Sequence, residues 1–120
     1  MTFSEQIDKL VAKLTELTAR DKVDWQETAN LDTYLARVEK FVVTINKQGS
    51  EMLGGYSFQI LDATGRAIEG VTAPYAGRDR SSDSRTNWER LRDLYEIARR
   101  RALHSEKVLS DLLASLDRIA

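Results

Sequence analysis

The side chains that could carry catalysis or bind a metal are few and scattered. His104 is the only histidine, and the chain has no cysteine. Asp111 would share roughly its face of a helix seven residues on, but two ligands do not make a zinc site. Asp24, Glu27 and Asp32 form an acidic group with no recognisable proton acceptor or oxyanion donor beside it. We therefore expect no catalytic residue, no metal site and no cofactor, and predict that the protein is not an enzyme.

A group of arginines is the other feature that could bind a ligand. Residues 76–104 carry eight arginines against five acidic residues, whereas the whole chain has a net charge of −1. Such a cluster could bind phosphates, with Tyr75 and Trp88 stacking on bases. Acidic residues are interleaved with the arginines, so a solvated helix face is the competing interpretation. The candidate nucleic-acid contacts are Arg78, Arg80, Arg85, Arg92 and Arg99.

The last third of the chain has the pattern of a long amphipathic helix or of two helices in line. Between Asn87 and Ile119, apolar or small residues recur at alternating spacings of four and three. Thr86 and Glu89 have the spacing of a helix-capping box. A helix of this length spans roughly 50 Å at 1.5 Å per residue, whereas a domain of this size has a radius of gyration of about 14 Å. The helix must therefore break, for which His104-Ser105 is the candidate, or overhang, or pack on another chain.

This excess of apolar surface predicts an interface. One stripe of the C-terminal helix cannot be covered by a small sheet and one N-terminal helix, and an uncovered apolar patch usually marks a binding surface. We predict a homodimer or a complex with another protein; the alternative is that the last turns fold back onto the domain. The opposing stripe would be Phe3, Ile7, Leu10 and Leu14, and the predicted interface residues are Leu91, Tyr95, Leu109, Leu112, Leu113, Leu116 and Ile119.

The remaining pattern predicts an α+β fold. A helix is expected over Ser4–Ala19, and the residues from Thr33 to Lys47 alternate with period two, either as two strands joined at Glu39-Lys40 or as one bent strand. Trp25 is expected in the core, beneath a segment that is either a short edge strand or a connector.

Two further strands follow, over residues 56–60 and 66–72. Asp62 to Gly65 is a turn signal between them, a bulge is expected near Glu69-Gly70, and Pro74 ends the second strand. Residues 75–86 form a polar segment, expected to be a mobile loop. The prediction is a two-layer sandwich, in which an antiparallel four-stranded meander is flanked by an N-terminal helix and a long C-terminal helix, in the order α-β-β-β-β-α.

Composition bounds the size and setting. A chain of 120 residues, 42% hydrophobic and 31% charged, is typical of one globular domain spanning residues 1–120. Residues 1–5 do not resemble a signal peptide, and no apolar run approaches the ~20 residues of a membrane span. The expected location is the cytoplasm.

Three segments resemble small bacterial proteins of uncharacterised function. They are residues 25–28 (Trp-Gln-Glu-Thr), residues 56–65 and residues 94–100 (Leu-Tyr-Glu-Ile-Ala-Arg-Arg). The resemblance covers most of the chain, and its motifs are structural. It implies a bacterial cytosolic protein and carries over no active site.

Overall fold

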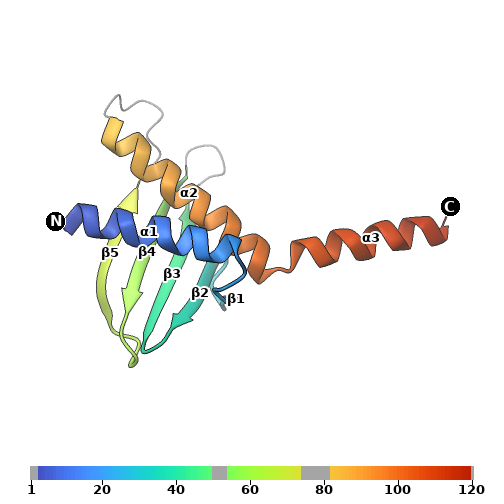
Figure 1. Ribbon diagram of the computed structural model, residues 1–120, viewed down its shortest axis with the longest axis horizontal. Helices are drawn as coiled ribbons and strands as arrows, with labels where there is room; N and C mark the ends of the chain where they lie inside the picture. The colour runs from blue at the N-terminus through green and yellow to red at the C-terminus, as the bar shows by residue number, and fades with distance from the viewer. Residues whose placement is uncertain (1–2, 50–53, 74–81, 120) are drawn as a thin grey trace.

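The fold is a five-stranded antiparallel sheet with two helices on one face and a third helix projecting from the body (Figure 1). The structure is a computed structural model and describes residues 3–49, 54–73 and 82–119. The strands lie in the order β1-β2-β3-β4-β5, so each pairs with its neighbour in sequence. The elements are α1 (Phe3–Ala19), β1 (Trp25–Glu27), β2 (Thr33–Val38), β3 (Phe41–Gln48), β4 (Gly55–Leu61), β5 (Ala67–Ala73), α2 (Ser82–Ala102) and α3 (Ser105–Ile119).

The α+β class and the antiparallel meander are confirmed, but the prediction of four strands is wrong. The fifth strand is β1, three residues long, at the sheet edge beside β2, with Trp25 opposite Ala36. A segment of three residues is too short to show an alternating pattern. The sequence therefore could not decide between an edge strand and a connector. Trp25 itself is 2% exposed, as predicted.

Two of the turns between strands settle alternatives that the sequence left open or predicted. The turn between β2 and β3 is two residues long, and Glu39 adopts a φ of 55°, so two strands are present instead of one bent strand. In the turn before β5, Gly65 has a φ of 87°, and Asp62 Oδ1 accepts hydrogen bonds from the Thr64 hydroxyl and the Arg66 N–H. The Thr64 hydroxyl bond is the main cause that lowers the pKa of Asp62.

The bulge in β5 lies close to its predicted position. Ile60 pairs with Glu69 and Leu61 with Ala67, so Ile68 is the extra residue, one position before the predicted Glu69-Gly70. The strand ends at Ala73, immediately before Pro74.

The core forms between one face of the sheet and the two helices α1 and α2. Alternate strand residues point into it, among them Tyr34, Ile45 and Phe58, which are opposite one another across β2, β3 and β4. From α1 the core takes Ile7, Val11 and Leu14, and from α2 it takes Leu91, Leu94, Tyr95, Ala98 and Ala102. The opposite sheet face, with Leu35, Thr44 and Gln59 in one row, carries none of the buried residues of the core.

The start of α2 differs from the prediction. The helix begins at Ser82, so Arg85 and Thr86 are helical and the predicted cap at Thr86 is wrong. Polar residues such as Ser and Asp are common at helix N-termini, where they satisfy free N–H groups and complement the helix dipole. Polarity over residues 82–86 therefore did not indicate a loop. The rest of the predicted mobile loop, residues 75–81, lies outside the described residues.

A buried polar contact fixes the end of α1 against the sheet edge. Thr18 is fully buried; its hydroxyl donates to the Leu14 carbonyl at 2.6 Å and accepts the indole N–H of Trp25 at 2.9 Å. A buried indole N–H without an acceptor is costly, so this hydroxyl positions β1 relative to α1.

Replacement of Thr18 by valine tests this contact. Thr18→Val keeps the side-chain shape but leaves the Trp25 N–H unpaired, and we expect the free energy of unfolding to fall by about 1–3 kcal/mol. Thr15→Val is the matched control, because Thr15 also bonds a carbonyl one turn back, that of Val11 at 2.8 Å. Urea denaturation followed by tryptophan fluorescence measures both variants. Equal losses in the two would contradict a special role for Thr18.

Candidate protein-interaction surface

The C-terminal helical region breaks at His104, the residue that redirects the chain. α2 ends at Ala102, and the His104 N–H donates to the Arg101 carbonyl at 3.3 Å. His104 has a φ of 52°, the left-handed conformation that commonly ends a helix. Its own carbonyl accepts the Val108 N–H at 3.0 Å, which starts α3. The sequence left open one long helix or two helices in line, and the structure has two helices with a break at His104.

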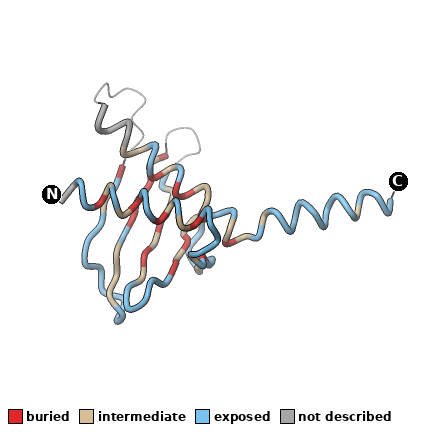
Figure 2. Tube along the Cα trace, viewed as in Figure 1, coloured by how far each residue is buried: buried red, intermediate tan, exposed pale blue. Residues whose placement is uncertain are grey.

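α3 projects away from the body and has no buried residue (Figure 2). Among the described helices and strands, it contacts only α2. The longest dimension of the molecule is 56 Å, and its radius of gyration of 16.1 Å exceeds the about 14 Å expected for a compact chain of this length. The alternative in which the last turns fold back onto the domain is therefore not what the structure has.

The apolar residues of α3 lie on one side of the helix. At about 100° per residue, they fall within an arc of about 140°, and charged residues occupy the opposite side. Each of these side chains is more than half exposed: Val108 57%, Leu109 60%, Leu112 53%, Leu113 64%, Leu116 53% and Ile119 80%. We call these six residues the α3 stripe. It is a contiguous exposed apolar surface on a single helix.

The predicted interface residues divide into two groups. Leu109, Leu112, Leu113, Leu116 and Ile119 belong to the α3 stripe. Leu91 and Tyr95 do not, because they are 2% and 3% exposed in the core of their own chain. The physical reason is that the same spacing of apolar residues runs through α2 and α3, but the sheet covers the apolar face of α2. The opposing stripe on α1 is likewise used inside the body, through Ile7 and Leu14.

Of the predicted nucleic-acid contacts, three lie on the described part of α2. Arg78 and Arg80 lie outside the described residues, and Arg85 lies in the first turn of α2. Arg92 lies 5.1 Å from the ring centroid of Trp88 and pairs with Asp93 at 3.4 Å. Arg99 is exposed near the C-terminal end of α2. Arg85, Arg92 and Arg99 are seven residues apart, so their positions lie along one side of α2.

A groove of about 820 Å³ lies where α3 leaves the body. It is lined by the end of α1 and the segment up to Trp25, by the C-terminal end of α2, and by the first residues of α3. Arg99, Arg100 and Lys107 are among its basic residues, and Leu109 belongs to both the groove and the α3 stripe. The sequence did not predict this site, because it is assembled from two segments, residues 19–25 and 97–109, that are far apart in the chain and that no local pattern connects. We call it the hinge groove.

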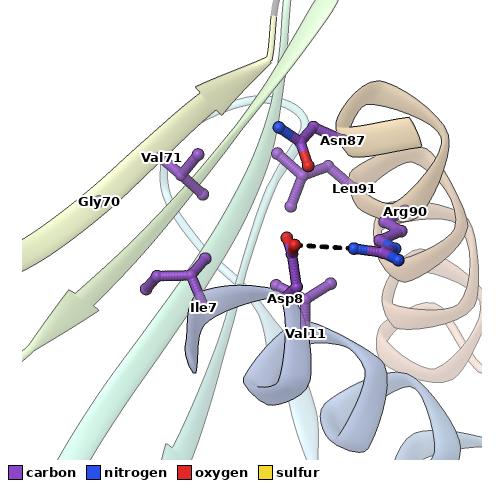
Figure 3. Close-up of a pocket in the computed structure, with 8 residues that line it drawn as sticks. All are labelled: Ile7, Asp8, Val11, Gly70, Val71, Asn87, Arg90 and Leu91. Carbon is purple, nitrogen blue, oxygen red and sulfur yellow. Dashed lines mark ion pairs between the residues drawn. The ribbon is translucent and has the colours of Figure 1, made fainter. Parts of the chain in front are cut away.

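Two smaller cavities lie within the body. One of about 90 Å³ lies between α1, α2 and β5, with the Arg90–Asp8 ion pair of 2.9 Å beside it (Figure 3). Within residues 3–49, 54–73 and 82–119, no three His, Cys, Asp or Glu side chains are grouped so that they could hold a metal ion. None of the described helices is both long and apolar enough to span a bilayer.

A polar cavity of about 260 Å³ lies beside the tyrosines of the core. Tyr95, Asp32 and Arg99 are among its lining residues, and the Tyr95 hydroxyl donates to Asp32 Oδ1 at 3.2 Å. The ring of Tyr95 packs on those of Tyr34 and Tyr56, with centroids 5.7 and 5.3 Å apart. Burial is the main cause that raises the pKa of Tyr95 far above its usual value, and the negative charge of Asp32 adds to it. A tyrosine kept neutral in this way is a structural hydrogen-bond donor.

In comparisons with known proteins, no family model, no curated protein and no solved structure matches the chain.

The raised pKa of Tyr95 predicts a loss of stability at alkaline pH. In the unfolded chain the phenol ionises near pH 10, whereas the folded protein holds it neutral. Its contribution to stability is therefore complete below about pH 10 and is lost as pH rises toward the folded-state pKa. Tyr95→Phe should cost about 1.5 kcal/mol at pH 7 through the lost bond to Asp32 and should reduce the alkaline decline. Urea unfolding at pH 7 and pH 11 measures both effects; an unchanged decline in the variant would contradict the assignment.

Proposed function

We propose that this protein is a non-enzymatic protein-protein interaction module that dimerises through its C-terminal helix. The observation that carries the proposal is the α3 stripe, six large apolar side chains each more than half exposed on one helix face. Following the resemblance noted above, the proposed setting is the bacterial cytosol. The proposal assigns no catalytic residue and no cofactor.

The physical support is that α3 has little to stabilise it as an isolated helix in water. Isolated helices shorter than about 12–15 residues are marginally stable, and α3, with 15 residues and none buried, is near that limit. Most helices in proteins are stabilised by packing of an amphipathic face. Burying one leucine side chain contributes about 1.5–3 kcal/mol of favourable free energy. A partner that covers the α3 stripe would therefore stabilise both the helix and the complex.

A second copy of the chain is the simplest partner. Closed two-fold dimers are the commonest soluble oligomers, and each contact in such a dimer occurs twice. The α3 stripe runs the length of the helix and is uninterrupted by charge, which suits pairing with an identical helix.

The test of dimerisation is a charge placed in the middle of the stripe. We expect the unchanged chain to show twice its mass of 13.6 kDa by light scattering. Leu112→Glu should weaken the dimer about 10²- to 10⁴-fold, because the loss of about 1.5–3 kcal/mol occurs in both copies. Circular dichroism checks that the body remains folded, which we expect because α3 adds no residue to the core.

Ser110→Glu is the matched control. It adds the same charge to the same helix, outside the stripe. It should leave the mass unchanged. A monomer at every concentration for the unchanged chain, or a Leu112→Glu variant that dimerises normally, would overturn dimerisation through α3.

The alternative function is binding of nucleic acid through the arginines of residues 78–101. Its support is the row of Arg85, Arg92 and Arg99 along one side of α2 and the cluster of Arg99, Arg100 and Arg101 at the hinge groove. Arg101 is already engaged there: it donates to the Ala19 carbonyl at 3.2 Å and lies 3.9 Å from Asp21.

A titration separates the two functions. With mixed DNA and RNA at low salt we expect no shift at micromolar protein, because dedicated binders neutralise many phosphates at once. Binding that weakens steeply as salt rises, and is lost in Arg99→Glu, would instead establish the nucleic-acid function.

A further inference from the structure

We infer that the dimer is antiparallel, with the two α3 helices side by side and the end of each reaching the hinge groove of the other copy. This inference rests on the proposed dimerisation through the α3 stripe and adds its geometry and a second contact. Each copy then contributes both a helix and a groove, so every contact is made twice.

Steric reasons favour the antiparallel orientation. α3 leaves the body and its far end stands clear of it (Figure 1). In an antiparallel pair the two bodies lie at opposite ends of the paired helices, where there is room for them. In a parallel pair both bodies would lie at the same end and compete for the space beside the hinge.

The length of α3 matches this arrangement. The helix spans Ser105–Ile119, about 22 Å at 1.5 Å per residue, and Leu112 is its midpoint. With the two-fold axis near Leu112, Ile119 of one copy lies level with Ser105 of the other. Ser105 lines the hinge groove, so the stripe is covered along its whole length and its last residues arrive at the groove.

The size of the contact also requires the groove. Stable protein interfaces bury about 800 Å² per partner, and two paired helices of 15 residues form only a narrow contact. The hinge groove continues the stripe through Leu109 and offers Val23 and Ile97 as further apolar lining. The end of the partner's helix therefore enlarges an interface that α3 alone would leave small.

The lining of the groove is net basic. It includes five basic residues, Lys22, Arg99, Arg100, Arg101 and Lys107, and three acidic residues, Asp21, Asp24 and Glu106. The far half of α3 carries Asp117 and Arg118. With the two-fold axis near Leu112, Asp117 of one copy lies level with Lys107 of the other, so Asp117 approaches the basic residues of the groove.

Single cysteines test the orientation, because the chain has none of its own. We propose Ser105→Cys, Leu112→Cys and Ile119→Cys in the full-length chain, oxidised and separated without reductant. Leu112→Cys should cross-link to itself. Ser105→Cys and Ile119→Cys should each fail alone, since identical residues lie about 21 Å apart along the axis and a disulfide needs Cα atoms within about 7 Å. Mixed together, these two variants should cross-link.

A charge exchange tests the groove contact. Asp117→Lys and Arg100→Glu should each weaken the dimer about two- to 30-fold, as expected for an exposed ion pair made twice. Combined in one chain, they should restore it. Arg37→Glu is the control, an equal charge reversal on β2 that should have no effect.

The outcomes distinguish this inference from the proposed function. Self-cross-linking of all three cysteine variants would mean a parallel dimer and would overturn the inference alone. A dimer by mass without cross-links at any of the three positions would overturn the inference and the role of α3. A monomer by light scattering, as for a chain whose α3 binds only a different protein, would overturn both the dimer and its geometry.

Discussion

The packing of α2 across the sheet is the interaction on which the rest of the structure depends. α2 contacts all five strands and both other helices. Its buried residues Leu91, Leu94, Tyr95, Ala98 and Ala102 recur at helical spacing and lie on the core face of the sheet. Each large side chain buried there contributes about 1.5–3 kcal/mol. Without this helix, the inner face of the sheet would lose most of its cover, because among the described elements α1 contacts α2 and not the strands at the backbone level.

The finite width of the sheet limits how much helix it can stabilise. α2 has 21 residues, about 31 Å of helix, and its C-terminal end reaches the hinge groove beside Trp25 on the edge strand β1. Beyond Ala102 no strand remains to pack against, and the left-handed His104 turns the chain outward. The apolar residues that follow are therefore exposed as a consequence of geometry. The same constraint explains why α2 has a buried core face and α3 has none.

The sequence predicted what depends on local periodicity. Period-two alternation located β2 to β5, helical spacing located α1 and the two C-terminal helices, and turn chemistry at Asp62 and Gly65 located the last hairpin. Features decided by tertiary contacts were not predictable in the same way. β1 is too short to have a period, and its place follows from the Trp25 bond to Thr18. The helical start at Ser82 was hidden because capping residues and loop residues have the same polar character.

The exposed surface was predictable to the same extent: its local pattern was visible in the sequence, but its tertiary contacts were not. The rhythm of the C-terminal third runs unbroken from Leu91 to Ile119, so sequence could not separate residues that the sheet covers from residues that it leaves exposed. The hinge groove could not be found at all, since it joins the end of α1 to the start of α3.

The spacing of apolar residues continues from α2 into α3 across the break at His104. If α2 and α3 were one straight helix, Ala98, Ala102, Ser105 and Leu109 would continue a single stripe on the face that packs against the sheet. Past the sheet edge that stripe would have no strand to pack against. The break at His104 keeps the apolar face but changes its direction, so that α3 stands apart from the core (Figure 2). A helix that remains amphipathic after leaving its own fold has a face suited to a second chain, and an identical α3 carries the same face at the same spacing.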